Sequence, residues 1–284
     1  ISERVTPRTK AILVVHQFGI PADMDAIMAI AKEHGLKVIE DCAQAHGAKY
    51  KDRYVGTIGD IGVFSLNVNK TIQTGEGGVC ITNDDDLAYR LQLIRNHGEA
   101  VVGAAGYENI VNIAGFNYRL TELQAAIGRE QFKKLDNINA IRLEYVAKLN
   151  EGISNIPFLK PMLSRKECYS TYYVYPLRFD EKMAGISRNE FISAVNAEGA
   201  LFFQGYTKPL YLQPMYQERK LYKHGYPFSA PANAGCSMDY KLGICPNTEN
   251  LHFHEMVINE HVREPQNIDD ISMLITIMKK VSYS

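Results

Sequence analysis

Strand-like and helix-like segments alternate through the first half of this 284-residue chain, and this alternation limits the possible folds more than any other feature. The strand candidates are four short apolar runs, at 11–16, 36–40, 59–65 and 78–82. Apolar residues at helical spacing predict a helix over about 24–34, between the first two runs, and a cluster of capping residues predicts another over about 84–95, after the last run. Alternation of this kind is typical of an α/β domain with a mostly parallel sheet.

The second half has a different pattern, which predicts a smaller α+β domain with long loops. A long helix is expected from about Leu120 to Leu149, followed by an aromatic-rich strand pattern around Cys168–Arg178. Further helices are expected over 187–198 and from about Asn267 onward. We therefore predict a large domain over residues 1–145 and a C-terminal small domain over residues 146–284.

The composition narrows the possible functions. The net charge is −1 and 22% of the residues are charged. The chain therefore has no strong electrostatic field that would favour binding to nucleic acid or to a membrane surface. No apolar run is long enough to span a bilayer, and no signal peptide is visible. The five cysteines are scattered and lack the spacing of metal ligands, which is typical of reduced thiols in a cytoplasmic protein.

Two reactive side chains follow the predicted strands closely. Asp41 ends one apolar run, and Lys70 lies five residues beyond Ser65, where another run ends. Ligands of parallel sheets bind beyond the carboxyl ends of the strands. A lysine that can form a Schiff base, with an acid that can pair with a pyridinium nitrogen, is the combination that pyridoxal 5'-phosphate (PLP) chemistry requires.

Each of these features also has an ordinary explanation. A single lysine after a strand is usually a solvated surface residue, and a single aspartate there is usually a cap or a turn residue. The glycine-rich stretch Gly75–Gly78 is usually just a turn. The order and spacing of the surrounding segments distinguish these explanations from the functional one.

Those segments together resemble the DegT/StrS family of sugar aminotransferases. This family belongs to the fold type I PLP enzymes of the aspartate aminotransferase superfamily, which have a mostly parallel-sheet large domain and a smaller α+β C-terminal domain. The resemblance covers the first half in order and is looser in the second half. Its segments are 6–12, 16–25, 40–48, 64–78, 95–98 and 115–126, then 205–216.

The resemblance implies a role for each matching position. Lys70 would hold the cofactor as a Schiff base and later move a proton between the substrate carbon and the cofactor. Asp41 would pair with the pyridinium nitrogen, and Gln44 would lie near the phenolic oxygen. Ala43 would pack on one face of the ring, and the Ser65 hydroxyl would contact the phosphate.

The resemblance also implies a homodimer with shared active sites. Asn117 would contact the phosphate of the cofactor in the neighbouring subunit. Arg119 could bind a carboxylate of the amino donor, because a guanidinium binds carboxylates through two hydrogen bonds. A structural ion pair at the dimer interface is an equally good interpretation of Arg119.

Other candidates remain open between function and structure. His46 and His97 lie in matching segments and either line the site or are structural histidines. An aromatic and basic group could contact a sugar nucleotide or simply pack; it comprises Tyr206, Lys208, Tyr211 and Tyr216. His252–Glu255 contains metal-ligand residue types, but no second cluster supports a metal there, and surface or interface residues are the better interpretation.

The favoured hypothesis is a PLP-dependent aminotransferase that transfers an amino group from glutamate to a nucleotide-linked 3- or 4-ketosugar. The family's sugar dehydratases have histidine where Lys70 stands, so lysine favours transamination. Cyclitol aminotransferases and aminobenzoate-type synthases keep the lysine and stay open. A non-catalytic regulatory or partner subunit is the alternative from another class.

The start of the chain differs from the family pattern. The family's N-terminal portion normally supplies a phosphate-binding loop, an aromatic residue that stacks on the cofactor and the first strands of the sheet. This sequence has no match to that portion, and a sheet without it would have an uncovered edge. We therefore expect the chain to be a fragment of a longer polypeptide, or to pair with a missing piece.

Overall fold

The computed structural model describes residues 1–98, 113–235 and 238–283. The chain divides into two compact units. The first comprises Ile1–Glu144 and Leu163–Tyr173, and the second comprises Tyr145–Met162 and Val174–Ser284.

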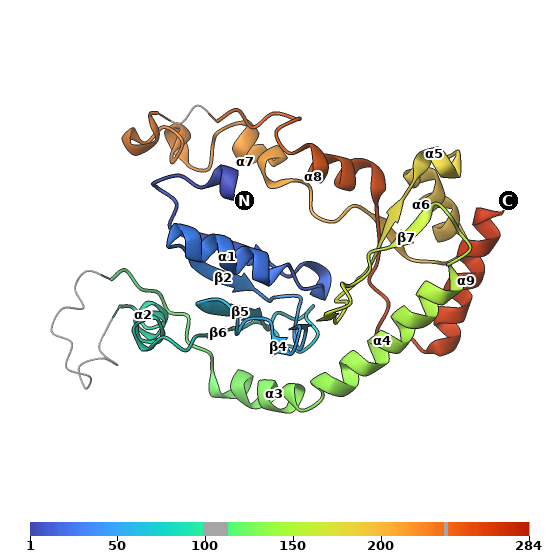
Figure 1. Ribbon diagram of the computed structural model, residues 1–284, viewed down its shortest axis with the longest axis horizontal. Coiled ribbons are helices and arrows are strands. Elements are labelled where there is room, and N and C mark those ends of the chain that lie inside the picture. Colours follow the sequence, from blue (N-terminus) through green and yellow to red (C-terminus); the bar gives the residue numbers. More distant parts are fainter. Residues whose placement is uncertain (99–112, 236–237, 284) are drawn as a thin grey trace. The chain divides into compact units, whose positions relative to one another are not determined.

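The first unit contains the alternating elements that the sequence predicts, together with two short strands at Lys49–Tyr50 and Arg53–Tyr54 that it does not predict (Figure 1). In chain order they are β1 (Ala11–Val15), α1 (Met24–His34), β2 (Lys37–Asp41), β3 (Lys49–Tyr50), β4 (Arg53–Tyr54), β5 (Ile61–Ser65), β6 (Gly78–Ile81), α2 (Asp85–Arg95), α3 (Glu122–Phe132), the first part of α4 (Leu135–Gly152) and β8 (Cys168–Tyr169). The main sheet has the strand order β1-β2-β5-β6, and a small sheet has the order β4-β3-β8. Strands β1, β2 and β5 are parallel, whereas β6 runs antiparallel to β5.

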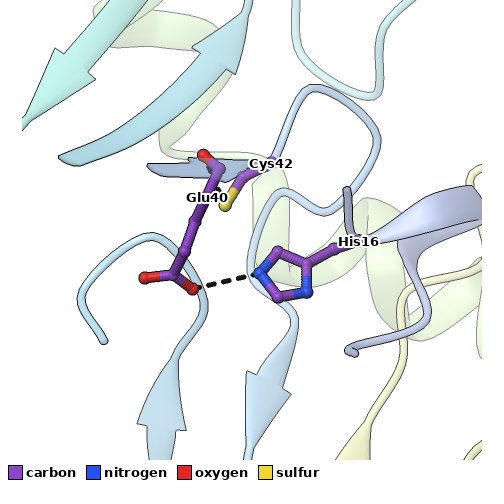
Figure 2. A group of neighbouring side chains, drawn as sticks. All are labelled: His16, Glu40 and Cys42. Carbon is purple, nitrogen blue, oxygen red and sulfur yellow. Dashed lines mark hydrogen bonds and ion pairs between the residues drawn. The ribbon is translucent and has the colours of Figure 1, made fainter. Parts of the chain in front are cut away.

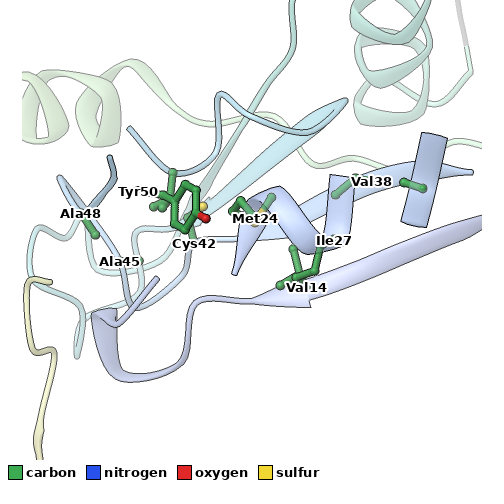
Figure 3. Packing of buried hydrophobic residues seen from close by; sticks show 10 residues of the cluster. Val14, Met24, Ile27, Val38, Cys42, Ala45, Ala48 and Tyr50 are labelled. Atoms are coloured by element: carbon green, nitrogen blue, oxygen red, sulfur yellow. The ribbon is translucent and has the colours of Figure 1, made fainter. Parts of the chain in front are cut away.

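Helix α1 covers one face of the main sheet (Figure 3). Asp23 caps its start by accepting a hydrogen bond from the Ala26 N–H, and Gly35 ends it in the left-handed conformation, which glycine adopts without strain. Its apolar residues Met24 and Ile27 pack with Val14 of β1. Burial of each such side chain contributes about 1.5–3 kcal/mol, so this packing fixes the face of the sheet that α1 covers.

The segment expected to form a single helix, from Leu120 to Leu149, forms two helices. Helix α3 ends at Phe132 and α4 begins at Leu135. Between them the Lys134 N–H donates to the Gln131 carbonyl, a tighter i to i−3 bond than the α-helical one. The tight turn places Leu135 in the core while Phe132 stays exposed, which a continuous helical pattern does not predict.

The aromatic-rich pattern around Cys168–Arg178 also forms two elements. Strand β8 pairs with β3 in the first unit, and β9 (Tyr175–Phe179) belongs to the sheet of the second unit. Residues 170–174 between the two strands are not in a strand. The single strand expected from this pattern is therefore wrong, because the intervening residues contact a turn far away in sequence, at residues 16–19.

The second unit packs helices on a four-stranded sheet with the order β10-β11-β9-β7. Its elements, besides the end of α4, are β7 (Leu159–Pro161), β9, α5 (Glu181–Ala184), α6 (Arg188–Ala197), β10 (Phe202–Gln204), α7 (Pro214–Gln217), α8 (Pro246–Asn250), a π-helix (Leu251–Glu255), β11 (Met256–Asn259) and α9 (Ile268–Ser282). Among the described residues, short 3-10 helices lie at Ser2–Arg4, Gln17–Gly19, Leu210–Leu212, Lys223–Gly225 and Pro231–Asn233.

The core of the second unit is rich in aromatic residues. The rings of Phe158 and Phe179 lie 5.4 Å apart, and those of Phe179 and Phe191 lie 5.1 Å apart. Such pairs add stability beyond the area they bury.

Within the described residues, no helix of either unit is both long and apolar enough to cross a bilayer.

Candidate active site

Strand alternation places two of the predicted site residues on one face of the main sheet. The parallel register pairs Asp41 of β2 with Val63 of β5, and Ser65 lies two residues further along β5. Because side chains alternate between the faces of a strand, Asp41 and Ser65 share a face. The preceding residue, Glu40, lies on the opposite face, together with Val14. Asp41 and Ser65 are the last residues of their strands.

The loop that follows β2, residues 41–48, is called the Asp41 loop below. The Asp41 carboxylate oxygen Oδ1 accepts a hydrogen bond from the Ala43 N–H at 3.0 Å. Gln44 is buried, and its Oε1 accepts from the Phe18 N–H at 2.8 Å. This bond makes Nε2 the donating end of the Gln44 amide.

The turn at residues 16–19 is held between the Asp41 loop and the segment 170–173. Phe18 has a φ of 61°, which is unusual for a bulky residue and needs support from its surroundings. The Tyr173 N–H donates to the Phe18 carbonyl at 2.8 Å, and the Thr171 N–H donates to the Gly19 carbonyl at 3.0 Å. A Cβ at Gly19 would lie 2.9 Å from the Gln44 carbonyl oxygen, so only glycine fits there.

The loop that follows β5, residues 66–77, is called the Lys70 loop below. It begins at Ser65, whose Oγ accepts from the Asn67 N–H at 3.3 Å, so the Ser65 hydroxyl can donate elsewhere. The Lys70 N–H donates to the Asn67 carbonyl at 2.9 Å, which closes a turn. The Lys70 side chain is half-buried, and its Nζ lies 5.0 Å from the centre of the Tyr173 ring.

His46 is a buried structural link between the two loops. Its Nε2–H donates to the Ser65 carbonyl at 2.9 Å. Burial lowers the pKa of His46 to about 4, and the nearby charges of Lys70 and Arg142 act in the same direction while the bond to Ser65 opposes them. The ring is therefore neutral at pH 7 and joins the end of β5 to the Asp41 loop.

Helix α4 contributes two buried polar residues, Asn139 and Arg142, which are called the α4 polar pair below. The Asn139 Nδ2 donates to the His46 carbonyl at 3.0 Å, and the Arg142 Nη1 donates to the Thr71 hydroxyl at 3.1 Å. Both side chains are at least 98% buried. The pair therefore holds both loops from one helix.

Comparison with known proteins assigns the chain to a family. The DegT/DnrJ/EryC1/StrS aminotransferase family matches residues 1–257. The chain belongs to this family. This confirms the family that the sequence resembles. It also confirms the predicted α/β fold of the fold type I enzymes.

Curated relatives of the chain in the family have different substrates in their names. The chain is 36% identical over 226 residues to GDP-perosamine synthase of Escherichia coli O157:H7. It is also 36% identical over 223 residues to L-glutamine:2-deoxy-scyllo-inosose aminotransferase of Streptoalloteichus tenebrarius. These matches cover 79% and 76% of the chain, but only 58% and 53% of the relatives' own lengths.

A solved aminotransferase structure has a fold similar to that of this chain. The aminotransferase from Psychrobacter cryohalolentis superimposes with a TM-score of 0.81 at 29% sequence identity. The match covers 98% of this chain and 69% of that one.

A second group of residues that the family resemblance singled out lies on two paired segments, 94–98 and 115–119. Asn96 and Asn117 form an isolated antiparallel bridge, and the Arg119 Nη1 donates to the Asn96 Oδ1 at 2.7 Å. His97 has a φ of 64°, and its N–H donates to the Phe116 carbonyl. The side chains of His97, Asn117 and Arg119 are all exposed, unlike the Asp41 loop.

The remaining sequence candidates lie in the second unit. Tyr206 and Lys208 are exposed and follow β10. The segment His252–Glu255 lies in the π-helix, where the buried Arg188 Nη1 donates to the His252 carbonyl at 2.7 Å. This bond gives the segment a structural partner within its own unit.

One buried cluster on the α1 face of the sheet has the residue types of a metal site (Figure 2). His16 Nδ1 accepts from the Ala22 N–H, so its Nε2 carries the proton and donates to Glu40 at 3.0 Å. Glu40 also accepts from the N–H groups of Gly56, Ile58 and Gly59. Burial, together with the nearby Glu40 and Asp41 carboxylates, raises the pKa of the Cys42 thiol, which stays protonated. The hydrogen bonds of this cluster identify it as structural.

Sequence reasoning missed three residues that contact Lys70 or the two loops: Tyr173, Asn139 and Arg142. Tyr173 lay within a pattern interpreted as a strand. The α4 polar pair had a detectable signal, because both residues occupy core positions of an apolar stripe. The buried positions of that stripe are Leu135, Asn139, Arg142, Val146 and Leu149. Polar residues on an apolar helix face indicate partners elsewhere in the chain.

Proposed function

We propose that this chain is part of a PLP-dependent aminotransferase that moves an amino group from glutamate to a nucleotide-linked 3- or 4-ketosugar. One observation carries the proposal. Asp41 and Ser65 share a sheet face at the ends of neighbouring parallel strands, and Lys70 lies on the loop that leaves the second strand. A carboxylate, a hydroxyl and an amine at this edge match the chemical groups of the cofactor.

The donor set fits PLP group by group. Asp41 would pair with the pyridine nitrogen, and the Ser65 hydroxyl, whose oxygen already accepts from Asn67, would donate to the phosphate. Gln44 would donate from Nε2 toward the phenolic oxygen, since its Oε1 is held by Phe18. Ala43 would pack against the ring, and Lys70 would hold the aldehyde. When bound, PLP supplies an electron sink for the carbanion formed in transamination.

The chain's own residues orient the reaction and move the proton. The Asp41 carboxylate keeps its orientation through the Ala43 N–H, so its charge has a fixed direction. Lys70 acts as the base and then the acid at its Nζ, and it transfers the proton to and from the substrate carbon. Half-burial limits the access of water to this amine.

The second copy of this chain supplies Asn117 in the proposed enzyme. The segment 116–132, which contains Asn117, has several exposed apolar residues, called the apolar stripe here: Phe116, Tyr118, Leu120, Leu123, Ile127 and Phe132. The rings of Phe116 and Tyr118 stack 5.1 Å apart. Apolar patches of this kind are typical of interfaces between proteins, and a homodimer with shared active sites covers the stripe.

Subunit complementation tests the shared site. A Lys70→Ala chain and an Asn117→Asp chain should each be inactive. Mixed dimers should regain activity, because one of the two sites then has both native residues. Leu123→Glu should convert the dimer to a monomer in light scattering. If mixtures stay inactive while heterodimers form, the site is not shared.

The substrate class remains between two chemistries that relatives support equally. The relative named GDP-perosamine synthase and the relative named for an inosose share the same identity with this chain. We favour the nucleotide-linked ketosugar, and a cyclitol ketone is the second candidate.

We place the proposed reaction in the cytoplasm. The free thiols of Cys42, Cys80, Cys168 and Cys245 support this location, and Cys236 lies outside the described residues.

The decisive experiment measures where the cofactor attaches. Addition of PLP to the chain should produce a yellow protein, and borohydride should then fix the cofactor to the peptide that contains Lys70. Lys70→Ala should lose both signals, whereas Lys134→Ala, on an exposed lysine, should keep them. Retention of transaminase activity by Lys70→Ala would refute the assignment. Absence of binding by a well-folded chain would favour the regulatory subunit.

The amino-loaded cofactor then provides an assay for the acceptor. Candidate nucleotide ketosugars and cyclitol ketones are added to the colourless form, and the true acceptor restores the yellow colour. Glutamate and glutamine are compared in the reverse direction as donors. A response to inosose-type ketones alone would replace the nucleotide-sugar proposal with the cyclitol one.

A further inference from the structure

Lys70 has an aromatic partner that the proposed chemistry does not yet explain. Its Nζ lies 5.0 Å from the centre of the Tyr173 ring, within the range of a cation–π interaction. Among the described residues, no carboxylate lies within 4 Å of this amine. Arg142, whose charge acts together with that of Lys70 on His46, is itself a cation. The ring face is therefore an attractive surface for a protonated Lys70.

The position of the ring is fixed by the backbone. Tyr173 is 9% exposed, and its N–H donates to the Phe18 carbonyl. Two residues earlier, Thr171 makes the parallel bond to Gly19. Because the Phe18 N–H also holds Gln44, one turn determines the position of both the ring and the amide.

We infer that Tyr173 is a positioning residue that holds the protonated amine of Lys70 when the lysine is not bonded to the cofactor. This inference rests on the proposed function, in which Lys70 is alternately bonded and free. A free lysine side chain has many rotamers, and the ring favours the one in which the ammonium lies over its face. The ring releases the amine once it loses its proton, because the attraction to the ring quadrupole requires a positive charge.

The inference predicts which replacements of Tyr173 keep the contact with Lys70 and which abolish it. The interaction needs the electron-rich face of an aromatic ring and does not need the tyrosine hydroxyl. Tyr173→Phe should therefore preserve it. Replacement by pentafluorophenylalanine keeps the size of the ring but reverses its quadrupole, so the attraction should be lost.

The experiment measures the reactivity of Lys70 without cofactor or substrate. The cofactor-free chain is labelled at pH 7 with trace acetic anhydride, which reacts only with neutral amines, and each lysine peptide is quantified by mass spectrometry. Exposed Lys134 is the internal reference. Lys70 labelling should rise by about 2- to 30-fold in the pentafluoro variant, which corresponds to the usual strength of a cation–π contact. Tyr173→Phe should stay within about twofold of the native chain.

Equal labelling of Lys70 in the phenylalanine and pentafluoro variants would overturn the inference. A rise of the same size in Tyr173→Phe would also overturn it, because the hydroxyl would then be the partner. If the pentafluoro chain does not fold, as judged by thermal unfolding, 4-fluorophenylalanine should give a smaller rise in the same direction. Borohydride fixation of the cofactor separates this inference from the proposed function. If borohydride fixes the cofactor to Lys70 but the pentafluoro variant leaves Lys70 labelling unchanged, only the role of Tyr173 is refuted. If Lys70 labelling changes but no cofactor is fixed, only the enzyme assignment is refuted.

Discussion

The Asp41 loop and the Lys70 loop leave neighbouring parallel strands, yet the first unit holds them very differently. Every residue of the Asp41 loop is buried or half-buried, whereas the Lys70 loop exposes Val68, Asn69 and Glu76. The Asp41 loop is bonded to the turn at 16–19, to the end of β5 and to Asn139. The Lys70 loop has one buried side-chain bond to α4, at Thr71.

One edge of the sheet thus has a buried loop beside a partly exposed one. In the proposed function Asp41 must keep its charge in one direction, and a buried loop with several hydrogen-bond partners can hold it there. In the same proposal Lys70 must bond, release and move a proton, which requires a loop that leaves the lysine side chain room to move. Substitutions in the two loops therefore test whether their stabilities differ.

The largest expected effect is on the strand end that supports the Asp41 loop. Glu40→Ala removes the acceptor of four buried or partly buried hydrogen bonds and leaves the His16 N–H unpaired. We expect a loss of about 3–5 kcal/mol in the free energy of unfolding, measured by urea titration. Lys70→Ala, on the other loop, should cost less than about 1 kcal/mol. Equal costs for the two variants would remove the contrast.

The second effect is a dependence of stability on pH that comes from the Asp41 loop. The pKa of His46 is lowered to about 4 in the folded chain, so the unfolded chain binds the proton more readily and acid favours unfolding. The stabilisation is complete above about pH 6.5 and is lost as the pH falls toward 4. Between pH 7 and pH 5 the loss should be about 2 kcal/mol.

His46→Gln tests this origin, because glutamine can still donate to the Ser65 carbonyl but does not titrate. Urea unfolding of this variant should show a flatter slope between pH 7 and pH 5, and His34→Gln, on an exposed histidine, is the control. Below that range Glu40 adds to the loss. Burial acts to raise the pKa of Glu40, but the bonds from His16 and from three backbone N–H groups lower it overall. Stability from Glu40 is therefore lost as the pH falls below about 4.5.

The sequence predicted the local parts of this architecture well. The strands β1, β2 and β5, together with the ends of α1, follow from apolar runs, from the Asp23 cap and from Gly35. These signals act over a few residues. The strand ends that carry Asp41 and Ser65 could therefore be derived from local patterns in the sequence alone.

The parts that the sequence did not predict depend on contacts between distant segments. The break between α3 and α4 follows from the need to bury Leu135. The gap between β8 and β9 exists because Thr171 and Tyr173 bond to a turn about 150 residues earlier. Such partners are invisible to local patterns, and for that reason the sequence indicates Lys70 as a candidate but does not indicate Tyr173 or the α4 polar pair.

The third effect tests the buried side-chain bond that joins the Lys70 loop to α4. Thr71→Val keeps the shape of the side chain but removes the hydroxyl that accepts from Arg142. A hydrogen bond to a charged group contributes about 1.5 kcal/mol or more, so unfolding should become easier by about that amount. The double variant Thr71→Val with Arg142→Leu should cost less than the sum of the two single variants, which a double-mutant cycle measures. Additive costs would mean that the two residues stabilise the unit independently.

The smallest effect is expected at the tip of the Lys70 loop, and it tests the contrast most directly. The Asn67 side chain accepts from the Asn69 N–H and donates to Glu76, both in partly solvated positions. Water replaces such bonds at little cost, so Asn67→Ala should change the free energy of unfolding by less than about 0.5 kcal/mol. Asn67→Asp keeps the acceptor but faces the Glu76 carboxylate, and it should be slightly less stable than Asn67→Ala. A cost near that of Glu40→Ala would mean that the tip is as rigidly held as the Asp41 loop, and Lys70 would then lack the freedom that its two positions require.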